Sequence, residues 1–263
     1  MSHYRHGDTA AIVLAAGQGT RMKSDLPKVL HPMAGRPLLG HVLETLEEVG
    51  VARVLVVVGY QRERVIETFH DAGVEWVVQA EQKGTGHAVT MARPNLAGFP
   101  GTLLVLYGDV PLMRAATLDQ LLVAHASSGA AVTFLSMRVP DATGYGRILY
   151  TDDGGFAGIV EHRDATPEQR RIDEVNSGIC VFSYPVLEKV LDELQAHNDQ
   201  GELYLTDTVG LIRRAGYPTH VVCGSDYREM MGVNTVEQLA EAERIHALFE
   251  EDGARRGART RGA

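Results

Sequence analysis

Residues 10–30 read AAIVLAAGQGTRMKSDLPKVL, and they carry the clearest fold signal in the sequence. Residues 10–14 form an apolar run that is too short for a helix core and rich in β-branched side chains, which predicts a buried parallel strand. Small residues follow, including two glycines, and they leave backbone N–H groups free to approach a phosphate chain. The cations Arg21, Lys23 and Lys28 come next. This order predicts an anion site at the carboxyl edge of an open α/β sheet.

The spacing of Gly17 and Gly19 excludes two common phosphate-binding motifs. The dinucleotide-binding fingerprint needs a third glycine where this chain has Met22. Lys23-Ser24 has no glycine before it, so the stretch is not a Walker P-loop. A Gly-x-Gly pair by itself is weak evidence for phosphate binding, since tight strand-to-helix turns use glycine for conformational reasons in many folds.

Read as a whole, LAAGQGTRMKSDLPKVL resembles the signature of the sugar-phosphate nucleotidyltransferases, an L-A-A-G-x-G-T-R-M loop with P-K a few residues later. The resemblance implies an α/β fold of the nucleotide-diphospho-sugar transferase type. Its sheet is Rossmann-like, mixed and mostly parallel, with flanking helices. It also implies catalytic cations at Arg21 and Lys28. The implied nucleotide contacts in the loop are Leu14, Ala15, Ala16 and Gly17.

Composition and charge limit the possible partners. The chain has 263 residues with 44% hydrophobic and 22% charged side chains, as in one large domain or two halves that share a cleft. Its net charge of −9 is unfavourable for nucleic acid or an anionic membrane. The apolar runs are too short to span a bilayer, and we expect a cytoplasmic protein. Cys180 and Cys223 are expected to be buried free thiols, with no disulfide framework or zinc site.

Strands and helices alternate through the first half of the chain. Apolar runs at 51–58, 74–78 and 101–107 predict buried strands. Helical stripes at 37–49 and 61–70 precede the first and the second of these strands. This rhythm predicts βαβ units with right-handed crossovers on a parallel sheet.

The segment QAEQKGTGHA begins with Gln79 at the end of a predicted strand and leads into a helix. A carboxamide can donate to a carbonyl and accept from an N–H, so Gln79 could read an imide edge such as that of uracil. A solvated loop glutamine is the commoner alternative, and position alone leaves it open. The segment is similar to the uridine-reading segment of the uridylyltransferases that make UDP-N-acetylglucosamine. That resemblance implies base contacts from Gln79, Gly84 and Thr85.

The segment YGDVP follows the predicted strand at 101–107. Asp109 would stand at the strand tip, on the same edge as the glycine loop. Mg²⁺ prefers hard oxygen ligands and is usually bound by one or two carboxylates plus substrate phosphates. The alternative is that Asp109 caps the next helix, since Pro111 suits a first helical turn. The family resemblance implies a magnesium-ligand role for Asp109 and sugar-side contacts from Tyr107 and Gly108.

The second half predicts a mixed sheet, because its strands are short and separated by turn residues. By position alone, Glu161 is one more surface carboxylate. The resemblance places Gly146, Glu161 and Asn176 around an amino-sugar. A backbone amide, a carboxylate and a carboxamide would together supply the donors and acceptors that sugar hydroxyls need.

The last motifs suit helix caps as well as ligands. Thr206 and Asp207 precede an apolar helix, and we expect them to cap and pack it. Asn234 is a candidate N-cap for the last helix, and the resemblance implies a second magnesium ligand there; the two roles are compatible. The stretch from Gly253 to the end, GARRGARTRGA, has no apolar periodicity and predicts a disordered tail.

The matching segments occur in the family's order and imply a nucleotidyltransferase domain over residues 1–236. Its nucleotide half would span about 8–115 and its sugar half about 116–236, followed by a C-terminal helix and tail at 237–263. In bacteria this domain precedes a β-helix acetyltransferase domain with hexapeptide repeats, and no such repeat occurs in this sequence.

The resemblance implies one reaction and leaves two rivals. UTP and N-acetylglucosamine 1-phosphate would give UDP-N-acetylglucosamine, a precursor for cell-wall (peptidoglycan) synthesis, and pyrophosphate. Arg21 would hold the leaving phosphates and Lys28 the α-phosphate, with Mg²⁺ on Asp109 and Asn234. One rival is another nucleotide or sugar 1-phosphate, such as glucose 1-phosphate. The other is a non-catalytic nucleotide-binding module. A homo-oligomer is possible.

Overall fold

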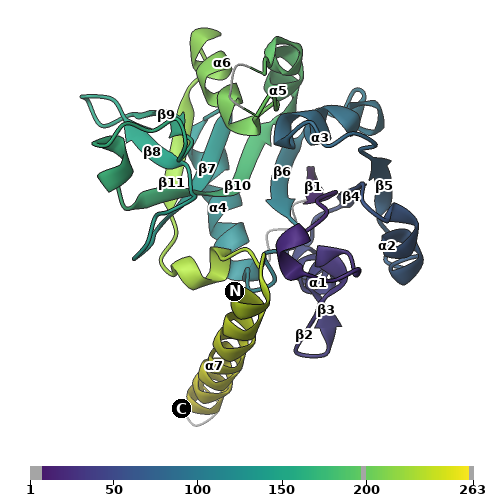
Figure 1. The fold of residues 1–263 in the computed structure, drawn as a ribbon. Coiled ribbons are helices and arrows are strands. Elements are labelled where there is room, and N and C mark those ends of the chain that lie inside the picture. The colour runs from purple at the N-terminus through teal and green to yellow at the C-terminus, as the bar shows by residue number, and fades with distance from the viewer. Residues whose placement is uncertain (1–7, 197–199, 261–263) are drawn as a thin grey trace.

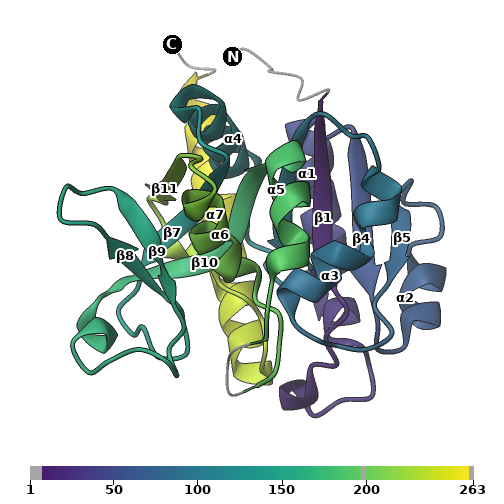
Figure 2. The ribbon, with the colours of Figure 1, turned by 90° about the horizontal axis from the view of Figure 1, so that it is seen from above.

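A mixed β-sheet with helices on both faces forms the centre of the protein (Figures 1 and 2). The structure is a computed structural model and describes residues 8–196 and 200–260, with the backbone alone from residue 253. Over this described part the sheet has nine strands, and seven of them follow the order β11-β7-β10-β6-β1-β4-β5. Strand β8 pairs with β10 and β9. The expected fold class is confirmed.

The first half is built from parallel strands joined by helices, as the alternating pattern predicts. Strand β1 lies between β4 and β6, and β4 also pairs with β5, all parallel. A small β2–β3 hairpin follows the glycine loop. The elements are β1 (Thr9–Ala15), β2 (Pro32–Met33), β3 (Arg36–Pro37), α1 (Leu38–Val49), β4 (Arg53–Val58), α2 (Arg62–Thr68), β5 (Glu75–Val78), α3 (Thr85–Met91) and β6 (Thr102–Tyr107).

The second half makes the sheet mixed. Strand β10 runs antiparallel between β6 and β7, and β11 pairs with β7 in parallel. One continuous sheet therefore joins the two halves. The elements are α4 (Ala115–Ser128), β7 (Val132–Arg138), β8 (Arg147–Tyr150), β9 (Phe156–Val160), β10 (Glu174–Ser183), α5 (Tyr184–Val190), α6 (Thr208–Arg214) and β11 (Thr219–Cys223).

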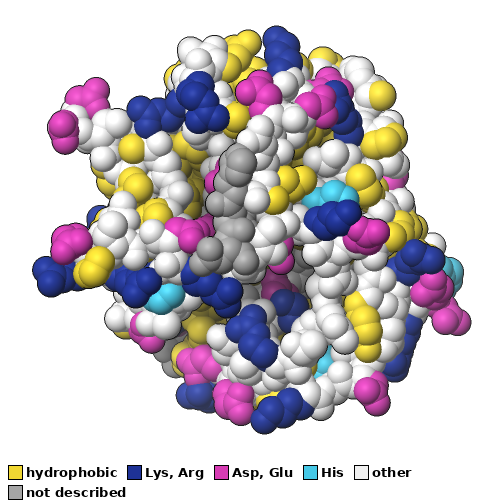
Figure 3. All heavy atoms as spheres, turned by 45° about the horizontal axis from the view of Figure 1, so that its top comes forward, with side chains coloured by type: hydrophobic (Ala, Val, Ile, Leu, Met, Phe, Trp, Pro, Cys, Tyr) yellow, Lys and Arg dark blue, Asp and Glu magenta, His cyan; other side chains and the backbone are white. Residues whose placement is uncertain are grey.

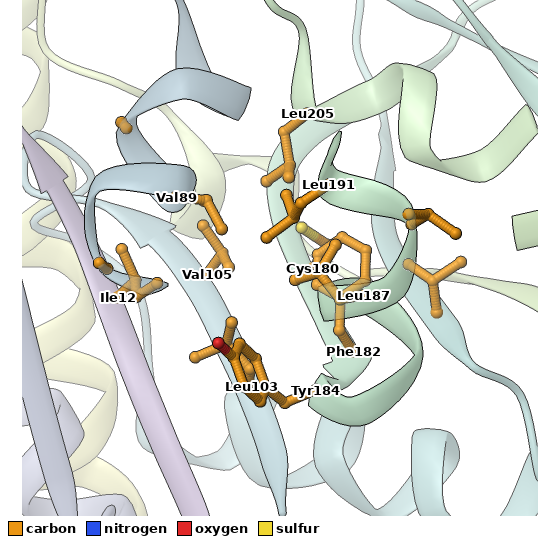
Figure 4. Close-up of a cluster of buried hydrophobic side chains, with 14 of the residues drawn as sticks. Ile12, Val89, Leu103, Val105, Cys180, Phe182, Tyr184, Leu187, Leu191 and Leu205 are labelled. Carbon is orange, nitrogen blue, oxygen red and sulfur yellow. The ribbon is translucent and has the colours of Figure 1, made fainter. Parts of the chain in front are cut away.

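Two hydrophobic clusters cover the two faces of the sheet. Alternate residues of β1 serve both, because side chains along a strand point to opposite faces. Ile12 packs with residues from α3, α5 and α6, and Val13 packs with residues from α1 and α4. Figure 4 shows the first cluster, where Val105 of β6 and Phe182 of β10 lie near Leu187 of α5. Both sheet faces are thus closed, and ligands must bind at an edge of the sheet.

The last helix, α7 (Val236–Thr260), extends away from the sheet (Figure 1). Its Ala242 and Ile245 pack in a third cluster with Met22, which lies next to Arg21 in the glycine loop. The helix continues to Thr260, into the stretch for which the sequence predicts a disordered tail; residues 261–263 lie outside the described part. Alanine and arginine are good helix formers, and extending an existing helix needs no new nucleus.

Two further expectations concern the burial of the cysteines and the absence of a membrane-spanning helix. Cys180 is buried and Cys223 is exposed, both as free thiols, so the expectation of two buried thiols is wrong for Cys223. Cys223 ends β11, the outermost strand on its side of the sheet, where only β7 pairs with it. Among the described residues, no helix is long and apolar enough to cross a bilayer.

Candidate functional site

The predicted site residues gather where the parallel strands end. Strands β1 and β6 are neighbours in register, with Leu14 opposite Tyr107, so the loops that follow them leave the same edge of the sheet. The glycine loop continues from β1 and Asp109 lies just beyond β6. Gln79 follows β5 on the same edge, and its backbone N–H donates to the carbonyl of Val58 at 2.8 Å.

Four polar side chains from distant parts of the chain form one group, which we call the charged cluster: Arg21, Lys28, Asp109 and Asn234. The Lys28 ammonium forms an ion pair with Asp109 and donates to Asn234 Oδ1 at 2.9 Å. Arg21 Nη2 donates to the same oxygen at 3.0 Å. Figure 3 shows a hollow near the middle of the molecule, with charged side chains of both signs in it. The four residues to which the family resemblance assigns phosphate and Mg²⁺ contacts thus lie together.

Close packing and a backbone hydrogen bond hold the segments that carry the charged cluster together. Gly19 has a φ of +67°, and a Cβ at this position would lie 2.6 Å from the Cβ of Lys28. Glycine therefore lets the loop that carries Arg21 pack against the stem of Lys28. On the other side, the Val233 N–H donates to the carbonyl of Asp109 at 2.8 Å. That bond holds the segment before α7 against the end of β6.

The helix-cap alternatives for the two proposed metal ligands are wrong. Helix α4 has Arg114 at its N-cap position, so Asp109 caps nothing there. At the start of α7, Thr235 Oγ1 accepts from the Gln238 N–H at 3.2 Å, and the Gln238 side chain accepts from the Asn234 N–H at 2.8 Å. Thr235 is therefore the cap, and this reciprocal arrangement leaves the Asn234 carboxamide for Lys28 and Arg21.

The oxygens of Asp109 and Asn234 fit a Mg²⁺ ion by donor type and by arrangement. Both are hard oxygen donors, and both contact one cationic group, the ammonium of Lys28. No group of three or more His, Cys, Asp or Glu side chains suited to a metal occurs in the described part of the chain. Mg²⁺ bound by one or two protein oxygens usually completes its coordination with water and substrate phosphates.

The nucleotide contacts implied by the sequence line one cavity of about 250 Å³. Gln79 is 4% exposed, so the alternative of a solvated loop glutamine is wrong. Gln82 Nε2 donates to the carbonyl of Ala16 at 2.7 Å, which ties the Gln79 segment to the glycine loop. The cavity also reaches Lys28 and Asp109 of the charged cluster. The implied nucleotide residues that line it are Leu14, Ala15, Ala16, Gly17, Gln79, Gly84 and Thr85.

The sugar-side residues line a second, adjoining cavity of about 660 Å³, which shares Thr85, Tyr107 and Glu202 with the first. Asn176 lies in it, and its N–H donates to the carbonyl of Gly146 at 2.8 Å. The implied sugar residues that line it are Tyr107, Gly146, Glu161 and Asn176, and Arg21 lines it as well.

Three residues take other places than the sequence suggests. Gly108 lines neither cavity, and its N–H donates to the carbonyl of Leu14 at 3.0 Å. Its small size lets the end of β6 pack against β1 and α1. The Asp207 side chain makes no cap hydrogen bond at the start of α6. The Thr206 hydroxyl donates to Glu161 Oε1 at 3.3 Å, so the capping role expected for these two is wrong.

His87 and Glu202 belong to the site but were not predicted from the sequence. His87 Nδ1 lies 3.0 Å from Gln79 Nε2, and Glu202 lines both cavities. A signal for His87 is its position in the first turn of α3, since the GTG turn before it brings the start of that helix back toward Gln79. Glu202 lies in the segment GELYLTD, and nothing in its local pattern separates it from a surface carboxylate.

Glu161 has a raised pKa, chiefly because burial disfavours its charge, while the hydrogen bond from Thr206 acts in the opposite direction. Folding is therefore opposed by the ionised form, and this penalty appears as the pH rises through the raised pKa. Glu161→Gln is expected to raise the melting temperature at pH 7 but not below pH ~4, where the carboxyl is protonated in both states. A melting-temperature difference that does not change with pH would contradict this assignment.

Gly178 lines the sugar-side cavity next to the ring of Tyr107. Its φ is +84°, and a Cβ would lie 2.3 Å from Tyr107. Burial raises the pKa of Tyr107, so the phenol remains neutral in the site. Gly178→Ala is expected to destabilise the fold by about 1–3 kcal/mol, measured by urea unfolding, from backbone strain and displacement of the ring. Gly144→Ala, also at positive φ but with open space around it, is the control for strain alone.

The mixed sheet and the loops at its carboxyl edge define the class of protein, an α/β domain of the type that binds nucleotides. The particular family follows from comparison, because residues 11–201 match the model of the "MobA-like NTP transferase domain". The chain belongs to this family.

Several similar proteins bear the name "Bifunctional protein GlmU". The one from Synechococcus sp. (strain CC9902) is 50% identical over 237 residues, which cover 90% of this chain and 52% of the relative. The one from Thermobifida fusca (strain YX) is 50% identical over 242 residues, 90% of this chain and 50% of the relative. The one from Corynebacterium aurimucosum is 47% identical over 257 residues, which cover 95% of this chain and 53% of the relative. The chain thus spans about half the length of these relatives.

Proposed function

We propose that the chain is a nucleotidyltransferase that transfers uridylyl from UTP to N-acetylglucosamine 1-phosphate. The observation that carries the proposal is the place of the charged cluster. Lys28 and Asp109 line the nucleotide cavity, while Arg21 lines the adjoining sugar-side cavity. Substrates bound in the two cavities would meet at the charged cluster. The family match and the similarity to the GlmU proteins support the same reaction class.

The reaction needs positioning and charge neutralisation more than proton transfer. A phosphate oxygen of the sugar phosphate would attack the α-phosphorus of UTP, forming a new P–O bond. The bond from the α-phosphorus to the bridging oxygen would break, and pyrophosphate would leave with the electron pair. Because the nucleophile is already an anion, no general base is required. Holding both anions together is then the main task of the protein.

The side chains of the charged cluster have distinct roles in this proposal. Lys28 would neutralise the charge that develops on the α-phosphate, and Arg21 would hold the leaving β- and γ-phosphates. Asp109 and Asn234 would hold Mg²⁺, which supplies further neutralisation of phosphate oxygens when bound. In the sugar cavity, Glu161 and Asn176 would contact hydroxyls or the acetamido group.

We propose a division of the domain into two halves. We assign the nucleotide half to about 8–115 and the sugar half to about 116–236, and the continuous sheet with β10 between β6 and β7 supports one functional unit. Asn234 lies in the segment just before the C-terminal helix, within the proposed domain. The substrates proposed for this unit are small molecules.

The test is a turnover assay with the purified chain, MgCl₂, UTP and N-acetylglucosamine 1-phosphate, with pyrophosphate release as the readout. Parallel reactions contain glucose 1-phosphate, galactose 1-phosphate, CTP or ATP in place of one substrate. The proposal expects the highest kcat/KM with UTP and N-acetylglucosamine 1-phosphate. Faster turnover with glucose 1-phosphate would favour a UDP-glucose-forming enzyme. No turnover with any substrate pair would favour a non-catalytic nucleotide-binding module.

A further inference from the structure

The side chain of Gln79 is held by two hydrogen bonds at the wall of the nucleotide cavity. It is 4% exposed and follows β5 directly. Its Nε2 donates to the carbonyl of Gly84 at 3.1 Å and lies 3.0 Å from Nδ1 of His87. Since Gln79 also lines the cavity, the orientation of its amide decides what a base meets there.

The two contacts together determine the orientation of the Gln79 amide and the tautomer of the His87 ring. The Gly84 carbonyl can only accept, so the amide nitrogen faces it. That nitrogen has no lone pair to offer, so His87 Nδ1 must be the acceptor and the ring proton is on Nε2. Both amide hydrogens are then used inside the protein. The carboxamide oxygen is the atom left for a ligand.

The positions of both partners are fixed by the packing of α3. His87 stands in the first turn of this helix. The Gly86 N–H donates to the carbonyl of Leu203 at 2.8 Å, and the Leu203 N–H donates to the carbonyl of Lys83 at 2.9 Å. These bonds hold the turn on both sides of Gly84. Rotating the amide by 180° would place its oxygen against two acceptors, the Gly84 carbonyl and the His87 ring.

We infer that His87 is a specificity-positioning residue that makes Gln79 an acceptor-only reader of the base. Uracil presents N3–H, a donor, at the edge that such an oxygen reads. Cytosine presents a lone pair at N3 and would be repelled by the same oxygen. A buried polar group that is left unpaired discriminates strongly between analogues. The inference rests on the proposed function, because it assumes that the cavity holds a nucleobase.

The test compares two carboxamides at position 87. Asparagine places its terminal group where Nδ1 lies in histidine, whereas glutamine reaches toward the position of Nε2. His87→Asn should therefore keep an acceptor for Gln79, and His87→Gln should lose it. For His87→Gln we expect KM for UTP to rise about tenfold, and the preference for UTP over CTP in kcat/KM to fall about tenfold, with kcat changed less than twofold. His87→Asn should restore both values to within about twofold of wild type.

The controls separate positioning from folding and from the proposed function. His70 is an exposed histidine just after the end of α2 and lines neither cavity, and His70→Ala should behave as wild type. Melting temperatures of all variants are recorded, so that kinetic constants of His87→Asn and His87→Gln are compared between folded proteins. Equal UTP preference in His87→Gln and His87→Asn would overturn the inference while leaving uridylyl transfer intact. Failure of the wild-type chain to turn over UTP would overturn the proposed function itself.

Discussion

Lys28→Met is expected to lower kcat for pyrophosphate release by about 10²–10³-fold while the protein stays folded. The Lys28 side chain is 15% exposed, and its ammonium contacts both Asp109 and Asn234. Methionine keeps the aliphatic stem that packs against Gly19 but removes the charge. Because the ammonium would act mainly on charge that develops in the transition state, kcat should fall more than KM rises. Steady-state kinetics with saturating UTP and sugar phosphate measure the effect.

Lys189→Met is the matched control for this prediction. Lys189 is exposed in the last turn of α5, outside both cavities. It should leave kcat and the melting temperature as in wild type. A Lys28→Met protein with wild-type turnover would remove this side chain from the mechanism. A protein that loses its cooperative melting transition would instead assign Lys28 to the fold.

Asp109→Asn is the second substitution with a large expected effect. It keeps the shape of the side chain and removes its charge, so the candidate metal site loses its only carboxylate among the described ligands. We expect kcat to fall about 10²–10³-fold and the Mg²⁺ concentration for half-maximal rate to rise. A magnesium titration of initial rates measures both effects.

Two comparisons make the Asp109 result decisive. Asp71→Asn changes an exposed carboxylate after α2 and should alter neither the rate nor the magnesium dependence. The double variant Lys28→Met/Asp109→Asn should be little worse than either single variant, because residues that act as a unit are not additive in their effects. Fully additive losses would mean that the two side chains act independently. An unchanged magnesium dependence in Asp109→Asn would exclude it as a ligand.

Much of the fold could be predicted because its signals are local. The apolar runs that became β1, β4 and β6 are short, β-branched and bounded by glycine, and such runs bury on both faces of a parallel sheet. The helical stripe before Gly50 predicts α1 for the same reason, since it places apolar residues on one face and glycine at the end. The edge of the sheet that holds the site also follows, because all parallel strands end there.

The roles of single side chains were harder to predict because they depend on distant partners. Asn234 and Thr235 are both good N-cap residues, and only the reciprocal bonds with Gln238 show which one caps α7. Gln79 has the composition of a loop residue, yet it is 4% exposed because α3 and Gly84 close over it. Cys223 has apolar neighbours in sequence, but its strand lies at the edge of the sheet.

Local sequence patterns were sufficient to predict the order of strands and helices and the glycine loop within residues 10–30, at the edge of the sheet where the candidate site lies. These depend on backbone conformation and on hydrophobic periodicity over a few residues. Only the tertiary structure decided that the Lys28 ammonium joins Asp109 to Asn234, and that His87 directs the amide of Gln79. Those contacts join residues far apart in the chain or depend on the orientation of a single side chain, and no short-range pattern records either.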